Sequence, residues 1–186
     1  ILVSKNLDVL GNISSSGDFI QTGDGVEPFL SASSGNLTLS GSGRGQIEVD
    51  YRLFDTGSAH LSSAGGGMGD IFKFGGSTTT AGKIYYLESA GTWALTDADA
   101  GGTTSGSIAV ALGTNSTDHG MLFRGVAKLS ADPGGAIGAP LYISTTAGQA
   151  QSAVLGSGDF SRVIGHNLDV SGLVHFNPDS TTIKVS

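Results

Sequence analysis

The chain contains no cysteine and no long uninterrupted run of apolar residues. Without cysteine, it can have neither a disulfide framework nor a zinc site built on thiolates. A membrane-spanning helix needs about 20 consecutive, mostly apolar residues, and no stretch of this sequence approaches that length. We therefore expect no disulfide scaffold and no membrane insertion.

Charge is also scarce, since 13% of the residues are charged, whereas 38% are hydrophobic and 31 are glycine. A disordered chain would carry more charge and fewer large apolar residues, so this chain is expected to fold with many tight turns. The formal net charge is −7, and the nine lysines and arginines form no cluster. A field of this sign repels phosphate backbones and anionic lipid headgroups, so we expect no nucleic-acid partner.

Helical periodicity is missing as well, because Gly or Ser interrupts almost every window at the 3.6-residue spacing. Alternation with a period of two is frequent instead. It is clearest in IEVDYRL at residues 47–53, where the apolar residues share one face of a strand. Further strands are predicted at residues 71–74, 83–87, 93–95, 108–112, 121–129, 141–143, 162–167, 173–176 and 182–185. Short strands separated by glycine-rich turns predict an all-β fold, either a β-sandwich or a barrel.

Residues 1–45 differ from the rest, because very short apolar alternations are separated there by runs of Gly and Ser. Such a segment is either a flexible linker or an extended arm packed against identical arms of neighbouring chains. The arm is favoured, since a linker has no need of apolar residues such as Leu7, Val9, Ile13 and Phe19. We therefore predict an extended shaft or collar at residues 1–45 and a β-sandwich or barrel knob at residues 46–186.

No local pattern typical of catalysis or nucleotide binding is present. The glycine-rich run at residues 41–45 precedes a predicted strand, whereas a phosphate loop requires a following helix. A nucleophile elbow of the Gly-x-Ser-x-Gly type is not seen. Asp97 and Asp99 could in principle form a carboxylate pair, but they are expected on exposed faces. We predict a non-enzymatic protein with no catalytic residues.

Two of the four histidines have both a binding and a structural interpretation. His166 and His175 lie on neighbouring predicted strands, with Asp169 nearby, and could meet as a pair of metal ligands. None of the histidines has the i,i+2 or i,i+4 spacing of a preformed metal site. Ordinary strand histidines are the favoured interpretation, and we predict no metal and no cofactor.

The aromatic residues Tyr85, Tyr86 and Trp93 could line a sugar-binding groove. Tyr85 and Tyr86 are adjacent, so they point to opposite faces of one strand and at least one of them belongs to the core. Core packing is the favoured interpretation. If the protein binds a glycan, Trp93 and Tyr85 are the residues that we expect to contact it.

The C-terminal half carries a family resemblance in the runs GAPLYISTTAG at residues 138–148 and VHFNPD at residues 174–179. These resemble a β-rich module near the ends of tail-fibre-like and other structural proteins of tailed phages, notably phages of marine cyanobacteria. The module is also similar to some capsid-decoration proteins. The run NLDVLGNIS at residues 6–14 resembles the shafts of phage fibres, in which three chains wrap into an interlocked β-structure.

This resemblance implies a homotrimeric structural protein of the virion, located on the tail or on the capsid exterior. Pairing between three chains would remove exposed strand edges, with Leu7, Val9, Ile13 and Phe19 near the symmetry axis. The implied role is a fibre, spike or similar appendage that contacts other virion proteins and a host-surface glycan or receptor. Two alternatives remain open, namely a capsid-decorating (cement or head-fibre) protein and a carbohydrate-binding module.

Overall fold

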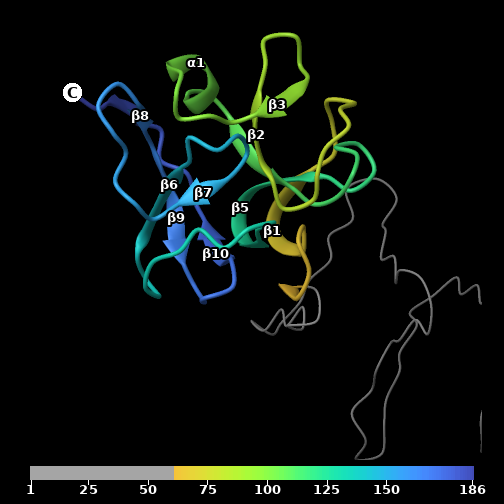
Figure 1. Cartoon of the computed structure of the whole chain (residues 1–186). Coiled ribbons are helices and arrows are strands. Elements are labelled where there is room, and N and C mark those ends of the chain that lie inside the picture. Colours follow the sequence, from red (N-terminus) through yellow and green to blue (C-terminus); the bar gives the residue numbers. More distant parts are fainter. Residues whose placement is uncertain (1–60) are drawn as a thin grey trace, which may run out of the picture. The chain divides into compact units, whose positions relative to one another are not determined.

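The computed structural model describes residues 61–186, called here the C-terminal module (Figure 1). The predicted shaft or collar, with Leu7, Val9, Ile13 and Phe19, lies outside the described residues. The same holds for the predicted strand at residues 47–53. The extended arm and the trimer therefore stay predictions.

The C-terminal module is built from short strands and one helical turn. The strands are β1 (Gly67–Phe72), β2 (Ile84–Leu87), β3 (Trp93–Leu95), β4 (Ile108–Ala111), β5 (Met121–Lys128), β6 (Pro140–Ile143), β7 (Ala150–Gln151), β8 (Phe160–Ser161), β9 (Val163–Asn167), β10 (Leu173–Phe176) and β11 (Ile183–Lys184), and the helix is α1 (Gly101–Thr104). Nine strands form one sheet in the order β3-β2-β4-β5-β10-β9-β6-β7, with β1 also paired to β5. β8 and β11 form a separate two-stranded sheet.

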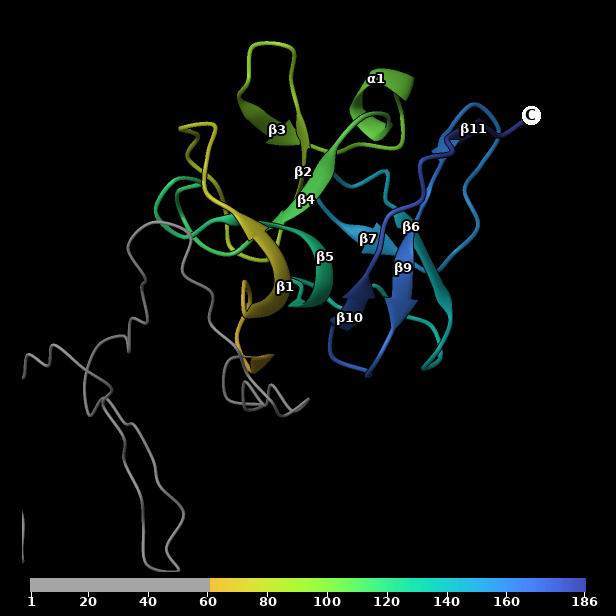
Figure 2. The ribbon, with the colours of Figure 1, turned by 180° about the vertical axis from the view of Figure 1, so that it is seen from behind.

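Strand β5 is the branch point of the large sheet. Its first residues, Met121 and Leu122, pair with β4, and its last residues pair with β10. All pairs are antiparallel, and β1 runs along β5 over most of its length. Figures 1 and 2 show that the sheet curls about this strand into a half-barrel. The predicted all-β class and barrel-like character are thus confirmed for the described residues.

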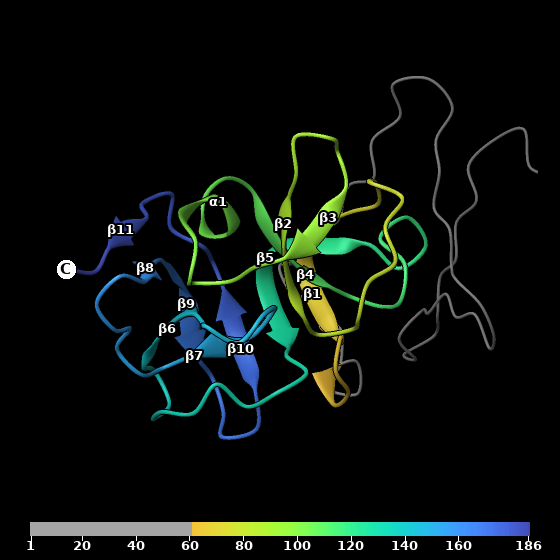
Figure 3. The ribbon, with the colours of Figure 1, turned by 45° about the horizontal axis from the view of Figure 1, so that its top comes forward.

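Most strands lie where the alternating pattern predicts them, and the exceptions are short or glycine-rich. β1 was predicted at residues 71–74 but occupies Gly67–Phe72, because its pairing with β5 overrides a glycine-rich run that is typical of a turn. β7 and β8 were not predicted, since each has two residues. No helix was predicted, and α1 is a single four-residue turn, which lies at one end of the sheet (Figure 3).

The main core lies on the inner face of the curled sheet. Its buried residues come from both halves of the half-barrel and are Ile84, Ala98, Ile108, Val110, Leu122, Ala127, Leu129, Leu141, Ile143, Ala150, Leu155, Ile164, Val174 and Phe176. A second cluster of Tyr85, Trp93, Ala109, Ala111 and Met121 covers the opposite face of β2, β4 and β5. Tyr85 packs in the second cluster and Tyr86 against the first, so the prediction that they point to opposite faces is confirmed.

A row of glycines crosses the sheet beside Phe176, one of the largest fully buried side chains. Phe176 is paired with Gly125 on β5 and with Gly165 on β9. These glycines have φ angles of 140° and 147°, which side chains rarely adopt. Glycine in a strand often marks a sharp bend or a close approach of backbones, and both apply here. The row lets the strands bend tightly around Phe176.

Candidate functional site

The predicted glycan contacts, Trp93 and Tyr85, both lie in the core. Each is 5% exposed. The Trp93 Nε1–H donates to the carbonyl of Phe74 at 3.2 Å, and the Tyr85 hydroxyl accepts from the Thr80 N–H at 2.8 Å. Both rings therefore have internal polar partners and present no open face to a sugar. The structure gives them the core role that the sequence favoured.

Trp93 belongs to an aromatic cluster that reaches the surface at β1. Its ring lies 5.3 Å from that of Phe74 and 5.8 Å from that of Phe123. Phe123 in turn contacts Phe72 edge to face at 5.3 Å. Phe72 is 56% exposed, and the neighbouring Ile71 is exposed as well. The cluster thus ends in an exposed ring, Phe72, on β1, whose only strand partner among the described residues is β5.

The buried polar side chains of the C-terminal module all bind the main chain. This holds for Thr79, Thr96, Thr104, Ser116, Ser144, Arg162 and Asn167. Among the described residues none of the seven is hydrogen bonded to another side chain. Their partners lie in loops, at strand ends and in the helical turn α1. These buried groups therefore hold loops in place and do not converge on a common point.

Arg162, just before β9, is the most heavily bonded of these side chains. Its Nη1 donates to the carbonyls of Thr104 at 2.8 Å and Gly106 at 2.7 Å, and its Nε donates to the carbonyl of Asp179 at 2.6 Å. Burial lowers the pKa of Arg162, while the charge of Asp179 opposes that shift. The guanidinium joins the end of α1 to the segment after β10. The sequence held no signal for this role, because its partners are more than 15 residues away.

Asn167 holds the loop before β6. Its Nδ2 donates to the carbonyls of Gly134 and Gly135, each at 3.3 Å. Its backbone N–H and carbonyl bind Ala139 and Gly138. The Oδ1 has no hydrogen-bond partner among the described residues. The side chain serves the loop, and nothing in the structure explains the unpaired oxygen.

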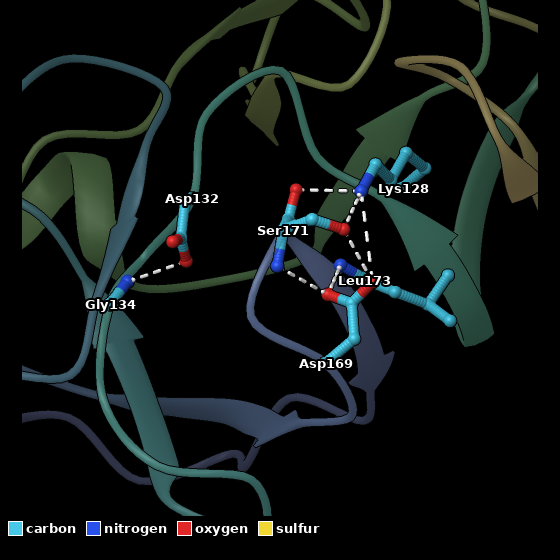
Figure 4. A network of polar contacts seen from close by, with 6 residues as sticks. All are labelled: Lys128, Asp132, Gly134, Asp169, Ser171 and Leu173. Carbon is cyan, nitrogen blue, oxygen red and sulfur yellow. Dashed lines mark hydrogen bonds and ion pairs between the residues drawn. The ribbon is translucent and has the colours of Figure 1, made fainter.

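A surface network ties the β9–β10 turn to the end of β5 (Figure 4). The Asp169 carboxylate accepts from the N–H groups of Ser171 and Leu173 at 2.8 and 2.7 Å and from the Ser171 hydroxyl. Lys128 Nζ lies 3.8 Å from the carboxylate and donates to Ser171. Burial is the largest single influence and raises the pKa of Asp169, but the hydrogen bonds to Ser171 and Leu173 and the charge of Lys128 together outweigh it and lower that pKa to about 2. The network stabilises a turn.

The remaining acidic candidates also act as turn residues. Asp97 Oδ1 accepts the N–H of Asp99 at 3.0 Å, an arrangement that fixes a turn. In the loop at residues 113–117, Asn115 Oδ1 likewise accepts the N–H and the hydroxyl of Thr117 and fixes a turn. Neither pattern brings two carboxylates together across a cleft.

His166 and His175 lie directly opposite each other on β9 and β10, as the predicted strand positions allow. Both side chains are exposed. Asp169 does not join them, because its carboxylate is engaged by Ser171, Leu173 and Lys128. In the described part of the chain, no group of three or more His, Cys, Asp or Glu residues could hold a metal ion.

Comparison with protein-family models, with curated proteins and with solved structures finds no match to this chain. Among residues 61–186, no helix has the length and apolarity that crossing a bilayer requires.

Proposed function

We propose that the protein is a structural subunit of an appendage, a fibre or spike, on the exterior of a virus particle. The observation that carries this proposal is the use of the buried polar side chains. In the C-terminal module all seven bind main-chain groups of loops, strand ends or the helical turn α1. In such an arrangement the buried polar side chains fix the loops of their own module, which favours a rigid structural unit.

This pattern differs from what catalysis requires. An active site gathers titratable or nucleophilic side chains within hydrogen-bond reach of one another, often with strongly shifted pKa values. Here the acidic side chains with lowered pKa values, Asp169 and Asp179, owe these shifts mainly to bonds with nearby turn residues. Their chemistry supports a scaffold, in line with the resemblance of the sequence to structural proteins of tailed phages.

The proposal includes a homotrimer held by the N-terminal shaft or collar. The apolar residues Leu7, Val9, Ile13 and Phe19 have too few large neighbours in the sequence for a core of their own. Identical arms that wrap together would bury these side chains and pair the strand edges of each chain. The partners in this assembly are two further copies of the chain.

Analytical ultracentrifugation of the full chain tests the assembly. We expect a species three times the 18.6 kDa of the chain at micromolar concentration. A Val9→Asp/Ile13→Asp double variant should sediment as a monomer, because two buried carboxylates per chain would face each other at the axis. Val154→Asp, at a highly exposed position of the C-terminal module, is the matched control and should stay trimeric. A stable wild-type monomer would contradict the proposed trimer.

The place of the protein on the particle needs a separate measurement. Electron microscopy of intact particles with a labelled antibody against the C-terminal module would locate it. Label on tail or fibre structures supports an appendage. Label spread evenly over heads would overturn the appendage and support the capsid-decorating alternative.

A further inference from the structure

We infer that His166 and His175 together bind a divalent transition-metal ion on the outer face of the sheet. The site goes beyond the proposed structural role and does not depend on it. β9 and β10 lie side by side in the large sheet (Figures 1 and 2). The two histidines occupy one register position of this antiparallel pair.

The register places the two imidazoles within reach of one ion. Side chains directly opposite on antiparallel strands leave the same face, with Cβ atoms about 4.5–5.5 Å apart. An imidazole nitrogen binds zinc at about 2.0–2.1 Å, so both rings can turn toward an ion held between and above the strands. Both side chains are exposed, and neither has an ion pair or a hydrogen bond among the described residues.

The neighbours along the same row leave the pair accessible. His175 is paired on its other side with Val126 of β5, and His166 with Pro140 of β6. Val126 and Pro140 neither ionise nor donate a side-chain hydrogen bond, so they do not compete for the imidazoles. The row therefore has two histidines at its centre and apolar residues on both sides.

The nearest cations on β5 each have an acidic residue close by in the fold. Arg124 and Lys128 lie two residues to either side of Val126. Arg124 lies opposite Asp70 of β1 in the strand register, and Lys128 Nζ lies 3.8 Å from the Asp169 carboxylate. A bound metal ion would thus meet little net positive charge.

The ligand type selects the ion. Imidazole favours zinc, copper and nickel, whereas magnesium requires oxygen ligands in an octahedron. Two protein ligands leave the other coordination positions to water or solute, so the site is open and its affinity is lower than that of a four-ligand structural zinc site. A bound ion would link β9 to β10 next to the bend at Gly165.

Unfolding of the full, untagged chain in urea, with and without added metal, tests this site. The strand register exists only in the folded chain, so a bound ion raises the folded-to-unfolded ratio. At 100 times the dissociation constant the expected increase is about 100-fold. We expect NiCl2 and ZnCl2 to raise the urea midpoint and MgCl2 to leave it unchanged. An unchanged midpoint with nickel and zinc would overturn the inference.

Three histidine variants locate the effect. His166→Ala and His175→Ala should each remove the rise in midpoint, while His119→Ala, at another exposed histidine, should keep it. An equal rise in wild type and His175→Ala would place the ion elsewhere and refute the site. Titration calorimetry should give one ion per chain, whereas an ion shared between chains would contradict a site built within one chain.

Discussion

Glycine at two strand positions decides how closely the strands of this sheet approach. A Cβ on Gly165 would overlap the carbonyl oxygen of His175 on β10, and a Cβ on Gly125 would overlap the carbonyl oxygen of Met68 on β1. Both glycines flank Phe176, which is fully buried. The packing of Phe176 therefore depends on the absence of two side chains.

Gly165→Ala should be among the most harmful single-methyl additions in the module. The substitution forces alanine to a φ of 147° and pushes β9 away from β10. Backbone strain of this kind costs about 1–3 kcal/mol, and the overlap with backbone adds to it. We expect a loss of about 3 kcal/mol or more in the free energy of unfolding, measured by urea denaturation.

Gly158→Ala is the matched control. Gly158 also has a positive φ, of 99°, but a Cβ there would meet no atom within 4 Å. Only backbone strain applies, so we expect a loss of about 1 kcal/mol. Equal losses in the two variants would show that the approach of β9 to β10 is not what Gly165 provides.

At the scale of elements, the local pattern predicts where the strands lie, but it does not predict to which face of the sheet every side chain points. The alternating runs at residues 108–112 and 121–129 predict β4 and β5 closely. Yet Leu122 and Ala127 share the inner core although they are an odd number of residues apart. The shift in register between β1 and β5 accounts for this, since an extra residue in β5 changes the face of all that follow. Such a bulge depends on a partner strand distant in sequence.

Of the candidate sites, likewise, the sequence located one and gave no indication of another. The sequence located His166 and His175 on neighbouring strands, because both lie in recognisable strands joined by a short connection. Nothing in the sequence indicated the Arg162 contacts. The three partners of Arg162 are backbone carbonyls, which every residue has, so no pattern of residue types marks them. Contacts to the main chain become visible only in the folded structure.

Arg162 connects α1 to the segment after β10, two parts of the module that strand pairing does not join. Thr104 ends α1, where the last carbonyls of a helix have no partner within it. Gly106 follows α1, and Asp179 follows β10. One planar guanidinium satisfies a carbonyl at each of these three positions. The end of the half-barrel beside α1 is therefore held by this side chain.

Arg162→Met should loosen that end of the module. The variant keeps most of the apolar stem but leaves three carbonyls without their donor. Each hydrogen bond to a charged group contributes about 1.5–3 kcal/mol, and water can reach part of the site. We expect a net loss of about 3 kcal/mol in urea unfolding, with faster amide hydrogen exchange around residues 101–106.

Two further variants separate this role from charge alone. Lys184→Met removes a cation that lies over the ring of Phe160, and it should cost less than about 1 kcal/mol. Arg162→Lys keeps the charge, but a single ammonium cannot replace a planar group with separated donors. Full stability of Arg162→Lys would show that charge, and not the three bonds, is what matters.

At the scale of the whole molecule, the stability of the half-barrel depends on pH through its turns. The Asp179 carboxylate accepts the N–H of Thr181, which is the main cause of its lowered pKa. Burial, the largest single influence, raises the pKa of Asp169, but its bonds to Ser171 and Leu173 and the charge of Lys128 outweigh burial and lower this pKa from 3.8 to about 2. Both carboxylates stabilise the fold only in their ionised form.

The sign of the pH dependence follows from these shifts. Between pH 3.8 and about 2 the unfolded chain binds a proton at Asp169 while the folded chain does not, so the free energy of unfolding falls as the pH is lowered through this window. The side chain is 36% exposed, and solvent screening limits the contribution to about 1 kcal/mol.

Asp169→Asn isolates this contribution from that of Asp179, which both proteins retain. The amide does not titrate, so the variant should be less stable than wild type by about 1 kcal/mol above pH 4. The difference should shrink as the pH falls and disappear below pH 2, where Asp169 is protonated in both states. Urea midpoints at pH 7, 4, 3 and 2 would follow this convergence. A difference that persists unchanged at pH 2 would mean that Asp169 holds the turn through its shape and not through its charge.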